Sequence, residues 1–322
     1  MSQPEQWGSI ITFYSYKGGV GRSMAVANVA RILSKRVRET GGRVLVIDWD
    51  LDAPGLHSYF PRSRFGGRSN RDGLIEYFTA LRDRLDASAV LNSCEVIGEC
   101  AAAETLLQSG DYILRDVSPS VDMMTAGRLD NSYQAKVLRF DWDSFFAKYS
   151  GAIEAFRDGL ARRYSYVLID ARTGLTDVSG ICTAIMPEKV VAVFAPNQQN
   201  LDGLMAMVNL SVEYRRASPD VRPLAVFPLP SRIDGAEQSE KSSWLLRFEM
   251  RFEALFEKLY GVSDCDLGSH FDEVQLPYVG YYSYGEKIAM LDEYRSQSLS
   301  LRRAYEVLAT RLVALEYPWQ VP

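Results

Sequence analysis

The chain has 322 residues, 47% hydrophobic and 24% charged, so it can bury a large core as one big domain or two small ones. Its net charge of −5 gives no global attraction to nucleic acid, but it does not exclude a local basic face. The apolar runs are too short to span a bilayer, and the first residues lack the order of a signal peptide. The four cysteines lack metal-ligand spacing and indicate reduced thiols. We therefore expect a cytoplasmic protein.

In chain order, the hydrophobic pattern predicts strands that alternate with helices. The predicted strands cover residues 10–14, 43–48, 121–127, 166–170, 189–195, 222–228 and 275–279. The predicted helices cover residues 24–33, a segment that begins at 72–78, and residues 142–163, 244–259 and 298–315. Such alternation favours a three-layer α/β/α fold with a mostly parallel central sheet. We predict a single domain over residues 1–322, with an irregular, insertion-like segment at about 57–135 and C-terminal helices at about 240–317.

A glycine-rich stretch, YKGGVGRS, lies between the first predicted strand and the first predicted helix. Strand, glycine-rich turn and helix together form the context of a phosphate-binding loop. The glycines let successive backbone N–H groups point inward, and the helix adds its positive end. The alternative is a glycine turn before an ordinary helix. We predict a P-loop NTPase fold in which a nucleotide contacts Lys17, Gly18, Gly19, Val20, Gly21, Arg22, Ser23 and Met24.

Several predicted strands end in acids, which is where such sheets place their chemistry. A phosphate site with Mg²⁺ needs a hydroxyl on the metal, an acid that holds its water shell and a carboxylate near the attacking water. Ser23, Asp170 and Asp50 suit these roles in that order, the two acids acting on the metal through water. Simpler roles stay open, since strand-end acids are common turn residues. Asp48 could be a structural acid, Asp52 a turn initiator, and Asp170 a strand-end acid or helix cap.

The phosphate loop departs from the ordinary P-loop pattern, because Tyr16 and Arg22 stand where that pattern has Gly and Lys. Lys17 instead precedes a glycine pair. The stretch resembles the deviant Walker A motif of the ParA/MinD family of dimerising ATPases, in the SIMIBI class. More narrowly, it resembles a bacterial subgroup whose motif reads Lys-Gly-Gly-Val-Gly-Arg.

The resemblance continues along the chain to about residue 235. The Asp-x-Asp strand end of the family matches Asp48 and Asp50, and its switch segment is similar to Asp170 through Gly174. Arg172 lies inside this predicted switch. It could sense the γ-phosphate, pair with Asp177 or bridge a dimer.

The base-binding loops of the family resemble residues 194–197 and 230–234. The resemblance implies base contacts from Pro196, Asn197, Ser231 and Arg232. Arg232 could stack its guanidinium on adenine, while Asn197 or Ser231 could bond the base edge. Adenine is the preferred base, and guanine stays open because the family often has asparagine where this chain has Ser231.

The resemblance implies a homodimer that forms when ATP is bound, with Lys17 reaching the phosphates of the partner. A cis contact or an exposed loop lysine are the alternatives. Arg22 keeps the positive charge of the usual lysine but is larger and planar, so hydrolysis should be slow. Catalysis would then rest on Lys17, Arg22 and Asp50.

The motifs and the resemblance together thus imply a Mg²⁺-dependent ATPase that acts as a nucleotide-gated dimerisation switch for a protein partner in a bacterial regulatory or defence system. The alternative is a hydrolysis-deficient nucleotide-binding scaffold. The apolar residues of the helix at 298–315 are better explained by packing than by a membrane, and an acidic chain gives no positive evidence for DNA binding.

Overall fold

The computed structural model describes residues 7–60, 71–89, 95–174, 180–220, 222–262, 264–292, 298–314 and 317–320. The chain divides into two compact units. The first comprises Met1–Ile10 and Leu33–Arg172, and the second comprises Ile11–Ile32 and Thr173–Pro322. Whether they make up one domain stays a prediction.

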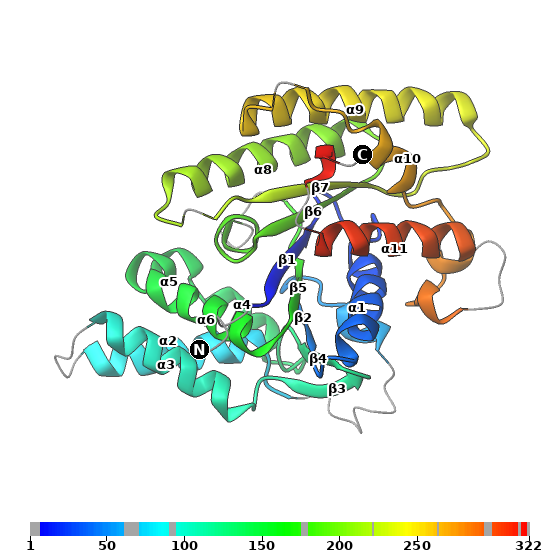
Figure 1. Ribbon diagram of the computed structural model, residues 1–322. Helices are drawn as coiled ribbons and strands as arrows, with labels where there is room; N and C mark the ends of the chain where they lie inside the picture. Colours follow the sequence, from blue (N-terminus) through cyan, green and yellow to red (C-terminus); the bar gives the residue numbers. More distant parts are fainter. Residues whose placement is uncertain are drawn as a thin grey trace. The chain divides into compact units, whose positions relative to one another are not determined.

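Four strands of the first unit run in the order β3-β4-β2-β5 (Figure 1). They are β2 (Val44–Trp49), β3 (Leu114–Ser118), β4 (Val121–Met124) and β5 (Tyr166–Ala171). β2 is parallel to both β4 and β5, whereas β3 is antiparallel to β4. Every residue of β2 is buried, which explains its nearly continuous apolar sequence.

The helices of the first unit pack around an aromatic core. They are η1 (Leu56–Tyr59), α2 (Leu74–Ala89), α3 (Glu95–Ser109), α4 (Tyr133–Arg139), α5 (Trp142–Lys148) and α6 (Ser150–Arg163). Trp49 at the end of β2 lies 5.6 Å from Phe78 and 6.2 Å from Phe156 between ring centroids. These buried rings hold β2, α2 and α6 together, because large aromatic surfaces dominate core energetics.

The predicted helix at 142–163 is wrong in one respect, since α5 and α6 are separate helices. Tyr149 leaves the helical conformation between them, with φ −134° and ψ 48°. Its ring is buried, and its hydroxyl donates a hydrogen bond to Asp86 over 2.6 Å. Anchoring this side chain to α2 takes precedence over helix continuity.

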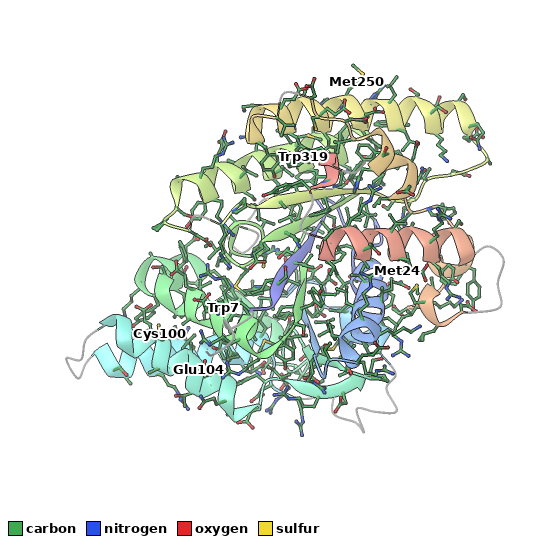
Figure 2. All side chains as sticks on the ribbon, in the orientation of Figure 1. Trp7, Met24, Cys100, Glu104, Met250 and Trp319 are labelled. Carbon is green, nitrogen blue, oxygen red and sulfur yellow. The ribbon has the colours of Figure 1, made fainter. Side chains whose placement is uncertain are left out.

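The second unit contains the strand order β1-β6-β7. Ile11–Tyr14 of β1 (Ser9–Tyr14), β6 (Lys189–Phe194) and β7 (Ala225–Pro230) are parallel. The principal helices are α8 (Gln198–Ala217), α9 (Gln238–Tyr260), α10 (Gly268–Glu273) and α11 (Ser298–Val313). The shorter elements are the π-helix η4 (Ile181–Ile185) and the 3-10 helices η5 (Gly280–Ser283), η6 (Ala289–Leu291) and η7 (Pro318–Gln320). Trp319, labelled in Figure 2, stacks on Tyr260 at the end of α9.

The seven strands form a mostly parallel sheet flanked by helices, which confirms the predicted α/β class. Helix α1 (Arg22–Arg38) follows β1, as the pattern predicts. The strand predicted at 275–279 is wrong, because these residues form an isolated bridge between Ile233 and Pro277 and no ladder. Among the described residues, no helix has both the length and the apolar character needed to cross a membrane.

Candidate functional site

The glycine-rich segment between β1 and α1 forms an open loop. Gly19 has a φ of 74° and Gly21 a φ of 88°, in the left-handed region that glycine adopts at no steric cost. A Cβ added at Gly18 or Gly19 would meet no atom within 4 Å. The outer side of the loop therefore has room for a ligand close to the backbone.

The loop ends at a helix N-terminus. The carbonyl of Gly21 accepts a hydrogen bond from the backbone N–H of Ala25 over 3.0 Å, so Arg22, Ser23 and Met24 make up the first turn of α1. Backbone N–H groups in a first helical turn have no partner within the helix. This turn contains no acidic residue. The amides and the helix dipole together favour an anion such as phosphate here.

Arg22 is buried rather than extended into solvent, with 7% of its surface exposed. Its Nη1 donates to the hydroxyl of Ser15 over 3.4 Å, which is a long hydrogen bond. The pKa of Tyr14 is raised well above its usual range by burial and by Tyr16, and the positive charge of Arg22 opposes that rise. The guanidinium thus lies close to Ser15, the residue that follows β1.

The start of the loop lies against α8. The ammonium group of Lys17 donates a hydrogen bond to Oε1 of Gln199 in the first turn of α8. One turn later, a Cβ at Gly203 would come within 2.3–2.4 Å of the ring of Tyr16. Two consecutive loop residues therefore contact two consecutive turns of α8.

The two predicted base loops follow β6 and β7, which lie side by side. Asn197 is exposed and caps α8, with its side chain accepting from the N–H of Asn200 over 2.9 Å. Ser231 is buried, and its hydroxyl donates to the carbonyl of Val20 in the phosphate loop over 2.8 Å. Arg232 is exposed and has a φ of 55°, which is uncommon for a residue with a side chain.

The predicted acids gather at the ends of β2 and β5 in the first unit. Asp48 and Asp170 are register partners on these parallel strands, and both are buried. Asp48 accepts a hydrogen bond from the N–H of Leu56 over 3.1 Å, as expected of a structural acid. Asp50 is also buried. Burial raises the pKa of Tyr133 well above its usual range, and Asp48 and Asp50 add to the rise.

The predicted switch starts at the end of β5. Arg172 forms an ion pair with Asp52. Its alternative partner, Asp177, lies outside the described residues. In the second unit, Gly174 has a φ of 79°, and its carbonyl accepts a hydrogen bond from the hydroxyl of Tyr14 over 3.1 Å. This bond attaches the segment to β1.

Sequence reasoning missed the part that α8 plays in this site. Tyr16 entered only as a departure from a motif, and neither Gln199 nor Gly203 was singled out. A glycine inside a helical pattern is a signal for close packing, so Gly203 could have been noticed. Nothing in the sequence distinguishes Gln199 from its neighbours.

No protein-family profile and no curated protein sequence matches the chain. Among solved structures, it is similar to a ParA-family ATPase from Chlorobium tepidum, with 18% identity, a TM-score of 0.53, and coverage of 94% of this chain and 98% of that chain. It is also similar to an McdA variant from Cyanothece in complex with ATP, with 12% identity, a TM-score of 0.57, and coverage of 97% of this chain and 98% of that chain. A third similar structure is the septum site-determining protein MinD from Pyrococcus horikoshii in complex with Mg-ADP, with 16% identity, a TM-score of 0.56, and coverage of 98% of this chain and 100% of that chain. The chain shares the fold of the ParA, MinD and McdA ATPases, a P-loop NTPase fold, and at these identities the likeness is one of fold.

Proposed function

We propose that the protein binds ATP together with Mg²⁺ and hydrolyses it slowly. The observation that carries this proposal is the phosphate loop, in which Gly19 and Gly21 adopt positive φ angles directly before the acid-free first turn of α1. Backbone amides and the helix dipole are the groups that bind polyphosphate without a large side chain. The ATP and Mg-ADP complexes of the neighbours in fold support the choice of ligand.

The donor chemistry of the chain suits Mg²⁺, which prefers oxygen ligands and retains several waters. We assign the hydroxyl of Ser23 as a direct ligand, and the carboxylates of Asp50 and Asp170 as ligands through water. When bound, the ion neutralises charge on the phosphate oxygens. Asp50 also orients the attacking water in this assignment.

In this assignment, Lys17 and Arg22 supply the positive charge that neutralises the phosphates. A planar, buried guanidinium binds phosphate through two N–H groups, but it cannot occupy the compact position of a lysine ammonium. We therefore expect binding to be retained and turnover to be slow. Arg172 and Gly174 belong to the switch that responds to the γ-phosphate.

For the base we propose contacts from Pro196, Asn197 and Arg232. The carbonyl of the Asn197 side chain is occupied by its helix cap, which leaves its NH₂ group for the base edge. Because the Ser231 hydroxyl donates to the backbone carbonyl of Val20, we assign Ser231 to holding the glycine-rich loop against the end of β7.

We further propose that ATP gates a homodimer in which Lys17 reaches the phosphates of the partner subunit, and that the dimer acts on a protein partner in a bacterial regulatory or defence system. An ATP-dependent contact of this kind makes association a population switch. A hydrolysis-deficient scaffold is the second candidate, and the replacement of the usual lysine by the buried Arg22 is the observation that favours it.

The test is the mass in solution by light scattering, with Mg²⁺ and either ADP or a non-hydrolysable ATP analogue. We expect the mass to double only with the triphosphate, and expect Lys17→Ala to abolish this doubling. Lys35→Ala, which alters an exposed lysine in the last turn of α1, is the matched control. A monomer under every condition would refute the dimer. Calorimetry without any heat of nucleotide binding would refute the function, and binding without phosphate release would establish the scaffold.

A further inference from the structure

The side chain of Lys17 has a neutral hydrogen-bond partner. Its ammonium donates to the amide oxygen of Gln199, which belongs to the first turn of α8. That turn is held in place by the Asn197 cap. It is also held by the contact of the next turn, at Gly203, with Tyr16. Gln199 is therefore presented to Lys17 by a fixed helix end.

A neutral amide, and not the nearby acid Asp202, accepts the hydrogen bond from Lys17. The nearby acid Asp202 receives hydrogen bonds from Gln198 and from Arg251 of α9, each over 2.9 Å. An amide oxygen carries no net charge, so it attracts an ammonium less strongly than a phosphate does. A carboxylate in place of the amide would compete with phosphate on more equal terms.

We propose that Gln199 is a positioning residue for Lys17, which it holds against α8 until a triphosphate takes the ammonium away. This inference rests on the proposed function. The neutral acceptor keeps the lysine ordered but releasable. The strength of the hydrogen bond between Lys17 and Gln199 therefore sets the triphosphate concentration at which the homodimer forms. The position of Lys17 thereby depends on α8, and through Asp202 on α9.

Three variants test this. Gln199→Glu converts the hydrogen bond into an ion pair, and Gln199→Leu removes the acceptor at similar volume. Gln198→Glu is the matched control, because Gln198 lies in the same turn but contacts Asp202 and Arg247 instead of Lys17. The helix dipole favours both new carboxylates, but Gln198→Glu also loses its hydrogen bond to Asp202, so a loss of helix would weaken binding at least as much in the control.

We expect Gln199→Glu to raise the dissociation constant of a non-hydrolysable ATP analogue, and the concentration at which the mass doubles, by about tenfold. Gln199→Leu should lower both by about two- to threefold, and Gln198→Glu should change them by less than about twofold. A role of Gln199 in helix stability alone would weaken binding in both Gln199 variants. That result, or equal effects of the two glutamates, would overturn the proposal.

A second measurement tests the contact without nucleotide. The rate at which an amine-reactive acylating reagent modifies Lys17, followed by peptide mass spectrometry, should rise in Gln199→Leu and fall in Gln199→Glu. Unchanged rates would overturn the proposal. If wild-type protein does not bind nucleotide, the proposed function fails. If it binds nucleotide equally in all variants, only this inference fails.

Discussion

The hydroxyl of Ser231, at the end of β7, donates a hydrogen bond to the carbonyl of Val20 in the phosphate loop over 2.8 Å. The carbonyl of Phe194, which ends β6, lies 3.1 Å from the same hydroxyl. One buried side chain thus connects the phosphate loop to the ends of two neighbouring strands, and the shape of the loop depends on this contact.

Replacing Ser231 with alanine should therefore impair binding as well as stability. We expect Ser231→Ala to lower the free energy of unfolding by about 1–2 kcal/mol, since it leaves a buried carbonyl without its donor. It should also weaken the affinity for an ATP analogue, measured by calorimetry. Ser211→Ala is the control, because Ser211 is buried in the same unit and donates to Thr183 over 2.9 Å. Equal loss of affinity in both variants would contradict this prediction.

Replacing Arg22 with lysine should separate binding from turnover. Lysine provides the same charge as a compact ammonium, so Arg22→Lys should leave the dissociation constant of ATP roughly level and raise the rate of phosphate release. The size of the increase could approach the ~10²-fold effect of one well-placed donor. A collapse of nucleotide binding would show instead that the buried guanidinium is needed to build the loop.

A methyl group at Gly203 should displace Tyr16. The added Cβ would lie 2.3–2.4 Å from the ring atoms, so Gly203→Ala should weaken ATP affinity several-fold by shifting the start of the loop. Gly98→Ala in α3 is the control, since nothing lies within 4 Å of its added Cβ and it should gain about 1 kcal/mol of helix propensity. The double variant with Tyr16→Ser should recover affinity. Failure of that rescue would show that the steric contact is not the cause.

The free energy of unfolding should fall as the pH is lowered, because the protein contains a buried histidine. Burial lowers the pKa of His270 to about 3, with Arg311 adding to the effect and the Pro228 carbonyl opposing it. Below about pH 6.5 the unfolded chain binds a proton that the folded chain does not, so the free energy of unfolding falls by up to about 1.4 kcal/mol per pH unit. Above that pH the contribution is fully present.

Urea unfolding between about pH 7.5 and 5.5 measures this slope. His270→Gln keeps a donor for the Pro228 carbonyl and an acceptor for Arg311, and it should lose the slope. His57→Gln alters the other histidine of the chain and should retain the slope. An identical pH dependence in His270→Gln and wild type would refute the assignment.

The elements that the sequence predicted well are those with a strong local signal. β2, β5 and β6 lie within about a residue of their predicted ranges, because strands buried on both faces must be almost continuously apolar. Helix α3 and strand β3 were not predicted. Among the described strands, β3 pairs with β4 alone, and its buried and exposed residues do not alternate regularly, so it lacks such a signal.

The amino-acid sequence alone specifies the glycine-rich loop, because Gly18, Gly19 and Gly21 between a strand and a helix act through local backbone geometry. It also placed acids at the ends of β2 and β5. The pairing of side chains follows instead from tertiary packing: Arg172 pairs with Asp52 in the first unit, and Lys17 with Gln199 in the second. Such contacts join residues more than a hundred positions apart, so they follow from strand order and helix packing, which no local pattern specifies.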